Sequence, residues 1–174
     1  MPRPVVDARA REALDALEHP VSVATAVRDR DGHLLDFRLA HINVAGARWA
    51  GLPTESIVGR LLTDLIPGMR AAGLFDALDA VVATGRPFVQ RGVFYEGNVE
   101  DGRSFAARFE LMAIRVGDGY LSAWDELPGD DGATLDLGAV VERARHAVPV
   151  IRLEARGPLR WRAGRPRIRI QPAG

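Results

Sequence analysis

The chain has 174 residues, 47 % of them hydrophobic and 26 % charged, which is typical of a soluble globular protein. It contains no cysteine, which excludes disulfides, thiolate metal sites, cysteine nucleophiles and thiol–flavin chemistry. No apolar run reaches the roughly 18–20 residues that a membrane span needs, and no apolar signal core follows the N-terminus. We therefore expect a cytoplasmic protein.

The formal net charge of +0 hides a difference between the two parts of the chain. Residues 1–137 hold 14 arginines and 21 acidic residues, a net charge of −7, whereas residues 138–174 hold nine arginines and two glutamates, a net charge of +7. This change in the sign of the net charge predicts a domain boundary near residue 137. All 23 basic residues are arginine, which codon usage in a GC-rich bacterial genome explains; a choice of guanidinium for bidentate phosphate contacts is the alternative.

The first predicted element is an amphipathic helix over residues 5–18. Its apolar residues recur at helical spacing: Val6, Ala10, Ala13, Leu14 and Leu17. A helix this short is marginal alone in water, so it must dock on something. Within the chain, the docking surface is the outer face of a sheet that carries Trp124 and residues of 103–115. Between chains, it is the same helix of a second copy.

The next segments alternate between strand and helix patterns. Residues 20–42 predict a hairpin around the turn Asp31-Gly32, because apolar and polar residues alternate along its second strand. Asn43 is placed to cap a short helix that Gly51 ends. Further short helical pieces lead to a helix over 74–84, which Gly85 ends, and strands are predicted over 87–95, 103–115 and 119–125.

Four short motifs follow one another along this pattern: Asn43-Val44-Ala45, Val58-Gly59-Arg60, Thr84-Gly85-Arg86-Pro87 and Trp124-Asp125. In this order and spacing, residues 10–126 resemble a PAS domain, the small cytoplasmic sensor fold of signalling proteins. The resemblance implies an α+β fold with a five-stranded antiparallel sheet, short helices on one face and an N-terminal flanking helix. It implies structural or signalling roles for these residues: Asn43, Trp49, Gly59, Trp124 and Asp125.

The resemblance also bears on assembly and domain organisation. It favours a homodimer through the flanking helix, with an interface formed by Val6, Ala10, Ala13 and Leu17. We divide the chain into the flanking helix (1–19), the PAS-like domain (20–126), a linker (127–137) and a basic tail (138–174), partly helical or disordered. Residues 135–147, which span the end of the linker and the start of the tail, predict a short helix. Proline and glycine after Asp125 break the signalling helix with which family members usually continue, which argues against rigid helical output.

Candidate ligand contacts are few. His41 lies in a strand beside the expected pocket, as a ligand contact or as a structural histidine. Arg91 and Arg108 lie on strands, where each is either an exposed sheet residue or a partner for an anionic ligand. Trp49 and Trp124 are expected to pack in the core or on a sheet face rather than to form ligand platforms.

Most cofactor classes find no support in the sequence. The histidines are scattered, so no metal site is predicted. Family members that bind haem commonly use a histidine on the long helix, and residues 73–85 contain none. No nucleophile elbow or phosphate-binding loop is present, and the sequence assigns no cofactor.

These observations favour a non-catalytic sensory or interaction module in signal transduction, which binds a small ligand or a protein partner and dimerises. One alternative is a small α+β cone-shaped enzyme with an acid/base residue in its cavity. Another is an adaptor whose basic tail binds nucleic acid. The tail is otherwise a loosely docked segment, or one that docks on the acidic part of the chain.

Overall fold

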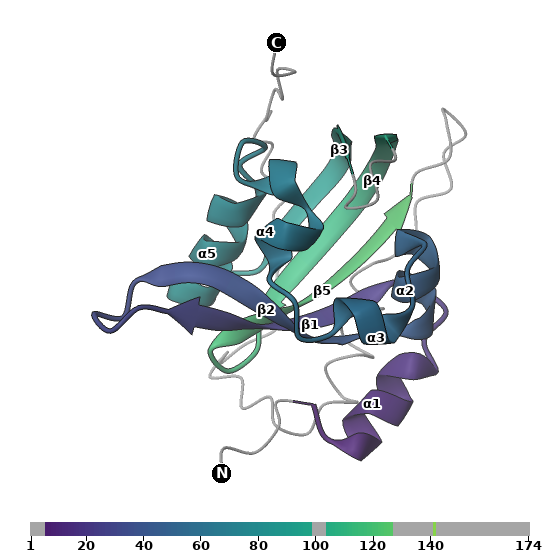
Figure 1. Ribbon diagram of the computed structural model, residues 1–174, viewed down its shortest axis with the longest axis horizontal. Coiled ribbons are helices and arrows are strands. Elements are labelled where there is room, and N and C mark those ends of the chain that lie inside the picture. The colour runs from purple at the N-terminus through teal and green to yellow at the C-terminus, as the bar shows by residue number, and fades with distance from the viewer. Residues whose placement is uncertain (1–5, 99–103, 127–140, 142–174) are drawn as a thin grey trace.

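The computed structural model describes residues 6–98, 104–126 and 141, with side chains described outside residues 92–108. The described elements follow one another in the order shown in Figure 1. They are α1 (Ala8–Asp15), β1 (Val21–Arg28), β2 (Leu34–Ile42), α2 (Val44–Ala50), α3 (Thr54–Ile57), α4 (Leu62–Leu65), the 3-10 helix η1 (Pro67–Met69), α5 (Leu74–Thr84), β3 (Phe88–Asn98), β4 (Ser104–Arg115) and β5 (Gly119–Glu126). None of the described helices is long and apolar enough to cross a membrane.

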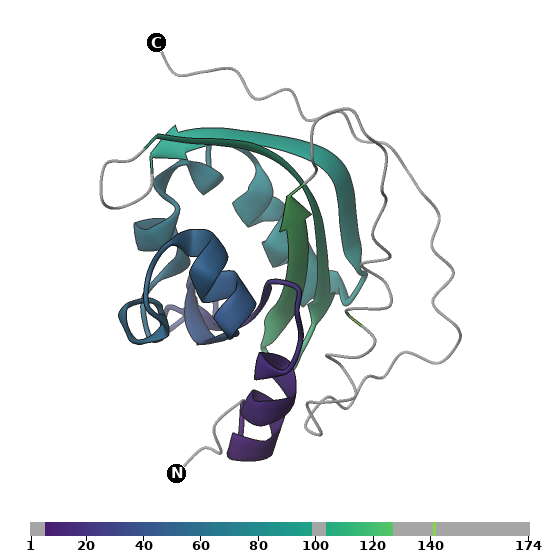
Figure 2. The same cartoon turned by 90° about the vertical axis from the view of Figure 1, so that its right-hand side faces the viewer.

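The five strands form one antiparallel sheet with the order β2-β1-β5-β4-β3. The last strand therefore lies in the middle, between the first hairpin and the β3–β4 pair. Figure 2 shows the sheet curving around α2, α3, α4 and α5, with α1 apart from these helices. The predicted α+β fold with a five-stranded antiparallel sheet and short helices is confirmed.

The side chains of the sheet divide between two apolar clusters, because successive residues of a strand point to opposite faces. Along β5, Tyr120 and Trp124 belong to the cluster that packs against α2–α5, on what we call the inner face. Leu121 and Ala123 belong to a second cluster on the opposite, outer face. Two faces with apolar side chains require a cover on each side, and α1 supplies part of the outer one.

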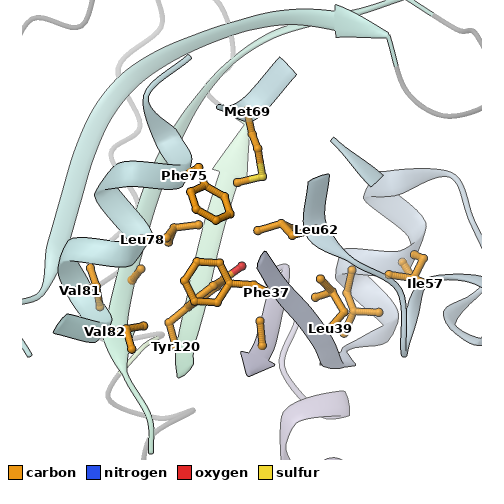
Figure 3. Packing of buried hydrophobic residues seen from close by; sticks show 14 residues of the cluster. Phe37, Leu39, Ile57, Leu62, Met69, Phe75, Leu78, Val81, Val82 and Tyr120 are labelled. Atoms are coloured by element: carbon orange, nitrogen blue, oxygen red, sulfur yellow. The ribbon is translucent and has the colours of Figure 1, made fainter. Parts of the chain in front are cut away.

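The inner cluster is centred on aromatic side chains. Phe37 of β2 lies 5.5 Å from the ring of Phe75 and 5.0 Å from the ring of Tyr120, measured between centroids. Figure 3 shows Phe37 and Tyr120 meeting the side chains of α5, including Leu78 and Val82. These side chains are at most 4 % exposed, and their burial stabilises the packing of α5 on this face.

The outer face is covered from within the same chain. Val6, Ala10 and Leu14 are at most 3 % exposed and pack in one cluster with residues of β1, β4 and β5. Of the two predicted docking surfaces for the flanking helix, the structure thus shows the intramolecular one. Trp124 was expected on this outer face and lies instead on the inner face, because the alternation along β5 places it with Tyr120.

The boundaries of the elements differ slightly from those predicted. The flanking helix was predicted over 5–18 and spans Ala8–Asp15, because the Asp7 side chain caps it by accepting the Ala10 amide at 2.8 Å. The helix ends at Gly51 and Gly85 are confirmed, with φ angles of 68° and 71°. The predicted linker and tail lie outside the described residues, as does the predicted helix over 135–147 apart from Val141.

Candidate functional site

The junction of three elements is built around the side chain of Asn43, which is fully buried. Its Oδ1 accepts the amides of Val21 and Gly46, at 3.0 and 2.9 Å, which joins the start of β1 to the first turn of α2. The sequence predicted the cap of α2. It did not predict the bond to Val21, since that partner is 22 residues away along the chain.

The amide nitrogen of Asn43 extends the junction to the flanking helix. Nδ2 donates to the carbonyl oxygens of Leu14, Leu17 and His19, at 3.2, 3.2 and 2.8 Å. These carbonyls belong to the end of α1 and the segment after it, where a helix leaves acceptors unsatisfied. One asparagine therefore connects α1, β1 and α2.

Gly59 occupies a backbone position that favours glycine, with a φ angle of 90°. Its amide donates to the Leu39 carbonyl at 2.7 Å, and its carbonyl accepts the Arg38 guanidinium at 2.6 Å. The segment after α3 is thereby held along β2.

An aromatic cluster lies at the inner face, where α2 approaches the sheet. Trp49 of α2 lies edge to face with Phe109 of β4, at 6.4 Å between centroids, and with Trp124 of β5, at 5.7 Å. Both tryptophans are half-buried, and partly buried apolar residues surround Phe109: Ile66, Leu74 and Phe88. This aromatic cluster is therefore incompletely covered, unlike the tightly buried cluster around Phe37.

Trp124 carries a polar atom without a partner in this cluster. Its Nε1 is buried and has no hydrogen-bond partner among the residues that the structure describes. A buried donor without a partner costs about 1–3 kcal/mol, and buried indole N–H groups usually find an acceptor. A ligand or water that presents an acceptor to this atom recovers that free energy. We take the aromatic cluster as the candidate functional site.

The predicted pocket residues do not gather at this site. His41 is 2 % exposed and lies on β2, where its register partner is Val23, an outer-face residue. Arg91 has an exposed side chain, and its Nε lies 2.8 Å from Oε1 of Glu110. Arg108 lies in β4 opposite Phe94, and its side chain is outside the described residues.

The neighbour of His41 is the flanking helix. Nε2 lies 3.2 Å from Oδ1 of Asp15, although not with the alignment of a hydrogen bond. Burial lowers the pKa of His41, the Asp15 carboxylate opposes this effect, and Arg11 adds to it. Of the two interpretations of His41 that the sequence left open, this geometry favours the structural histidine.

One group of side chains in the described part of the chain has metal-ligand spacing: Asp29, Asp31 and His33. All three lie in the β1–β2 turn. Oδ1 of Asp29 accepts the amides of Asp31 and His33, at 2.9 and 2.8 Å, so that this carboxylate stabilises the turn itself. Solvated acidic turns of this kind are common, and we assign no metal here.

The sequence analysis missed the aromatic cluster because its members come from three distant segments. Trp49 and Trp124 were interpreted as packing residues, and Phe109 was not among the candidate ligand contacts. The spacing of residues along the sequence does not show which strands and helices meet in space. The available signal was the set of tryptophans itself, since the described domain has only two.

Comparison with known proteins rests on structure. Neither a protein-family model nor a curated protein sequence matches the chain. Among solved structures, the LOV protein of Rhodobacter sphaeroides aligns with a TM-score of 0.51 over 84 % of this chain and 84 % of its own, at 20 % identity. A point variant of RsLOV aligns with a TM-score of 0.51 over 83 % of this chain and 94 % of its own, at 17 % identity.

A PAS domain from Colwellia psychrerythraea is also similar, with 19 % identity and a TM-score of 0.44 over 67 % of this chain and 92 % of its own. At such identities, similarity shows the fold, and the two alignments above 0.5 carry that conclusion. The sequence motifs implied a five-stranded antiparallel sheet with short helices on one face and a flanking helix, and the structure has this architecture. The chain therefore has the PAS fold.

Proposed function

We propose that this chain is a non-catalytic sensory module of signal transduction that takes a small ligand at the aromatic cluster of Trp49, Phe109 and Trp124. The observation that carries the proposal is the buried Nε1 of Trp124, for which the described part of the chain offers no hydrogen-bond partner. Ligand sites in proteins are mostly apolar, with a few polar groups that fix orientation. The cluster has this composition.

The chemistry of the cluster defines the class of ligand. Half-buried indole and phenyl rings offer faces and edges for a flat, aromatic molecule. The Trp124 N–H selects for an acceptor, a carbonyl oxygen or a ring nitrogen, on that molecule. Because the chain has no cysteine, the ligand is held without the thioether bond that a thiol forms.

The described buried carboxylates give the enzyme alternative no support. Asp36 is engaged by the amide of Phe37, at 2.6 Å, and by the hydroxyl of Thr63. Glu110 pairs with Arg91 on the opposite face of the sheet. Neither carboxylate lies in the aromatic cluster, where an acid or base of that enzyme would act.

The proposal is tested on freshly purified full-length protein. Native mass spectrometry reports a retained ligand, and a thermal-shift panel of planar aromatic compounds with acceptor groups reports binding by the emptied protein. We expect binding to quench tryptophan fluorescence. Trp124→Phe keeps an aromatic ring and removes the N–H donor. It should therefore lower the affinity for the ligand by roughly tenfold, which corresponds to the loss of one hydrogen bond.

Trp161→Phe, the same substitution in the basic tail, is the matched control and leaves the affinity unchanged. A protein that is isolated empty and shows no shift across the panel contradicts the ligand-sensor proposal. Binding that Trp124→Phe does not weaken places the ligand elsewhere.

A further inference from the structure

A second surface lies on the outer face of the sheet, next to the apolar cluster that α1 covers. Met112 and Ala123 are register partners on β4 and β5 and belong to that cluster. Two residues further along the same face, Glu110 lies opposite Asp125. Two carboxylates directly opposite each other repel, so this pair is stabilised by a nearby cation.

Arg91, the described partner of Glu110, does not balance the negative charge of Glu110 and Asp125 together. Glu110 is only 3 % exposed, and its carboxylate pairs with Arg91, whose side chain is 70 % exposed. The Arg91 guanidinium and the carboxylates of Glu110 and Asp125 together carry a net charge of −1. Burying a carboxylate in such a place is costly unless further donors reach it. A second guanidinium would match both the charge and the geometry.

Val141 places the beginning of the tail on this same face. Its side chain is fully buried and packs in the outer cluster with Val6, Ala10 and Leu14. The residues that follow it, 142–174, contain nine arginines and two glutamates. The nearest arginines, Arg143 and Arg145, come two and four residues after the buried valine.

We propose that the outer face of the sheet is the docking surface for residues 142–174 of the same chain. Val141 is the apolar anchor, and the carboxylates of Glu110 and Asp125 receive an arginine of the tail. The net charges of the two parts, −7 for residues 1–137 and +7 for residues 138–174, are complementary. Docking makes the tail a cover for the face where α1 also packs.

Limited trypsin digestion of the full-length protein tests this docking. All potential cleavage sites are arginines, because the chain has no lysine. Docking protects the arginines of 142–174, and cleavage there measures the fraction of time that the tail is undocked. We expect Val141→Asp to speed this cleavage by about tenfold or more, since proteolysis follows the population of the open state. The matched control is Val44→Asp, at a valine of α2 that is 52 % exposed.

The double variant Glu110→Gln, Asp125→Asn tests the charged contact without changing the apolar anchor. It should speed cleavage by roughly threefold. Raising NaCl from about 0.1 M to about 1 M should speed wild-type cleavage, because the screening length falls from about 10 Å to about 3 Å. This variant decides the question if Val141→Asp does not fold.

Three results overturn the proposal. The first is equal cleavage of the tail in wild type, in Val141→Asp and in the double variant. The second is protection that rises with protein concentration, because the tail then docks on a second copy. The third is wild-type cleavage in the tail as fast as that of a free peptide of the same sequence.

Discussion

Asn43 shows how much a single buried side chain can organise. A helix cap normally satisfies one or two amides of its own helix. Here the same oxygen also accepts the amide of Val21, and the nitrogen of the same side chain reaches three carbonyls at the end of the flanking helix. Its removal leaves buried groups of α1, β1 and α2 without partners.

We expect Asn43→Ala to lower the free energy of unfolding by about 2–4 kcal/mol, more than the roughly 1 kcal/mol expected for a cap alone. The amides of Val21 and Gly46 stay buried after the substitution and lose their acceptor, which is the costly case. Urea denaturation at constant pH measures the difference.

Asn43→Asp is the informative companion variant. It keeps the acceptor for Val21 and Gly46 and replaces the donor by an oxygen that faces the carbonyls of Leu14, Leu17 and His19. We expect α1 to undock first, seen as faster amide exchange in residues 8–15 than in α2. If Asn43→Ala and wild type unfold at the same urea concentration, the junction has no energetic role.

At the scale of elements, α1 and β2 are linked by a charged contact inside an apolar surface. Asp15 of α1 faces His41 of β2, and Arg11 of α1 is the other charged group that acts on this histidine. Burial lowers the pKa of His41, so the unfolded chain takes up this proton at a higher pH than the folded protein does. The stability that neutral His41 provides is present above the ordinary histidine pKa of about 6.5 and decreases as the pH falls below it.

We therefore expect the free energy of unfolding to fall as the pH is lowered below about 6.5, with a slope of up to about 1.4 kcal/mol per pH unit from His41. His41→Gln should flatten this slope. Asp15→Asn should steepen it, because the carboxylate that favours protonated His41 is lost. Urea denaturation over a pH series measures all three proteins.

His33→Gln serves as the control for the pH series, since the His33 side chain is 77 % exposed and lies in the β1–β2 turn. It should leave the slope in place. A slope that survives His41→Gln but disappears in His33→Gln would assign the pH dependence to the turn and contradict the role of the α1–β2 contact.

At the scale of the whole molecule, the flanking helix has less surface to offer a partner than its sequence indicated. Val6 and Ala10 are buried against the sheet of their own chain, and so is Leu14. Ala13 and Leu17 are half-buried and remain available in part. The homodimer through this helix stays a prediction, with an interface centred on Ala13 and Leu17 rather than on the whole stripe.

We expect a homodimer at micromolar concentration that Leu17→Asp converts to a monomer, because a buried carboxylate at a two-fold interface meets its own symmetry mate. Sedimentation velocity over a concentration series measures the assembly. Leu35→Asp, at a leucine of β2 that is 52 % exposed, is the control and should leave the dimer intact.

Deletion of residues 1–18 is a poorer test than the point variant. It uncovers the apolar outer face of β1, β4 and β5, which the helix covers in the structure, and exposed apolar patches of this kind cause aggregation. Wild-type protein that sediments as a monomer at high concentration contradicts the dimer prediction directly.

Several features could be predicted from the sequence because they depend on local chemistry. Alternation of apolar residues indicated the hairpin over 20–42, and glycines at 51 and 85 marked the ends of α2 and α5. The cap by Asn43 follows from the preference of a short amide for the first turn of a helix. The order of such local signals was sufficient to predict the PAS fold and its five-stranded sheet.

Only the tertiary structure decided which surfaces these elements share. The sequence shows that Trp124 lies in a strand, but not which face of the sheet its side chain occupies, because a shift of one residue in register reverses the face. It also does not show that Asp15 meets His41, or that Glu110 meets Arg91, since these contacts join segments 19 or more residues apart. Periodicity and local preferences determine the elements of this protein, whereas its buried polar contacts and its aromatic cluster depend on long-range packing.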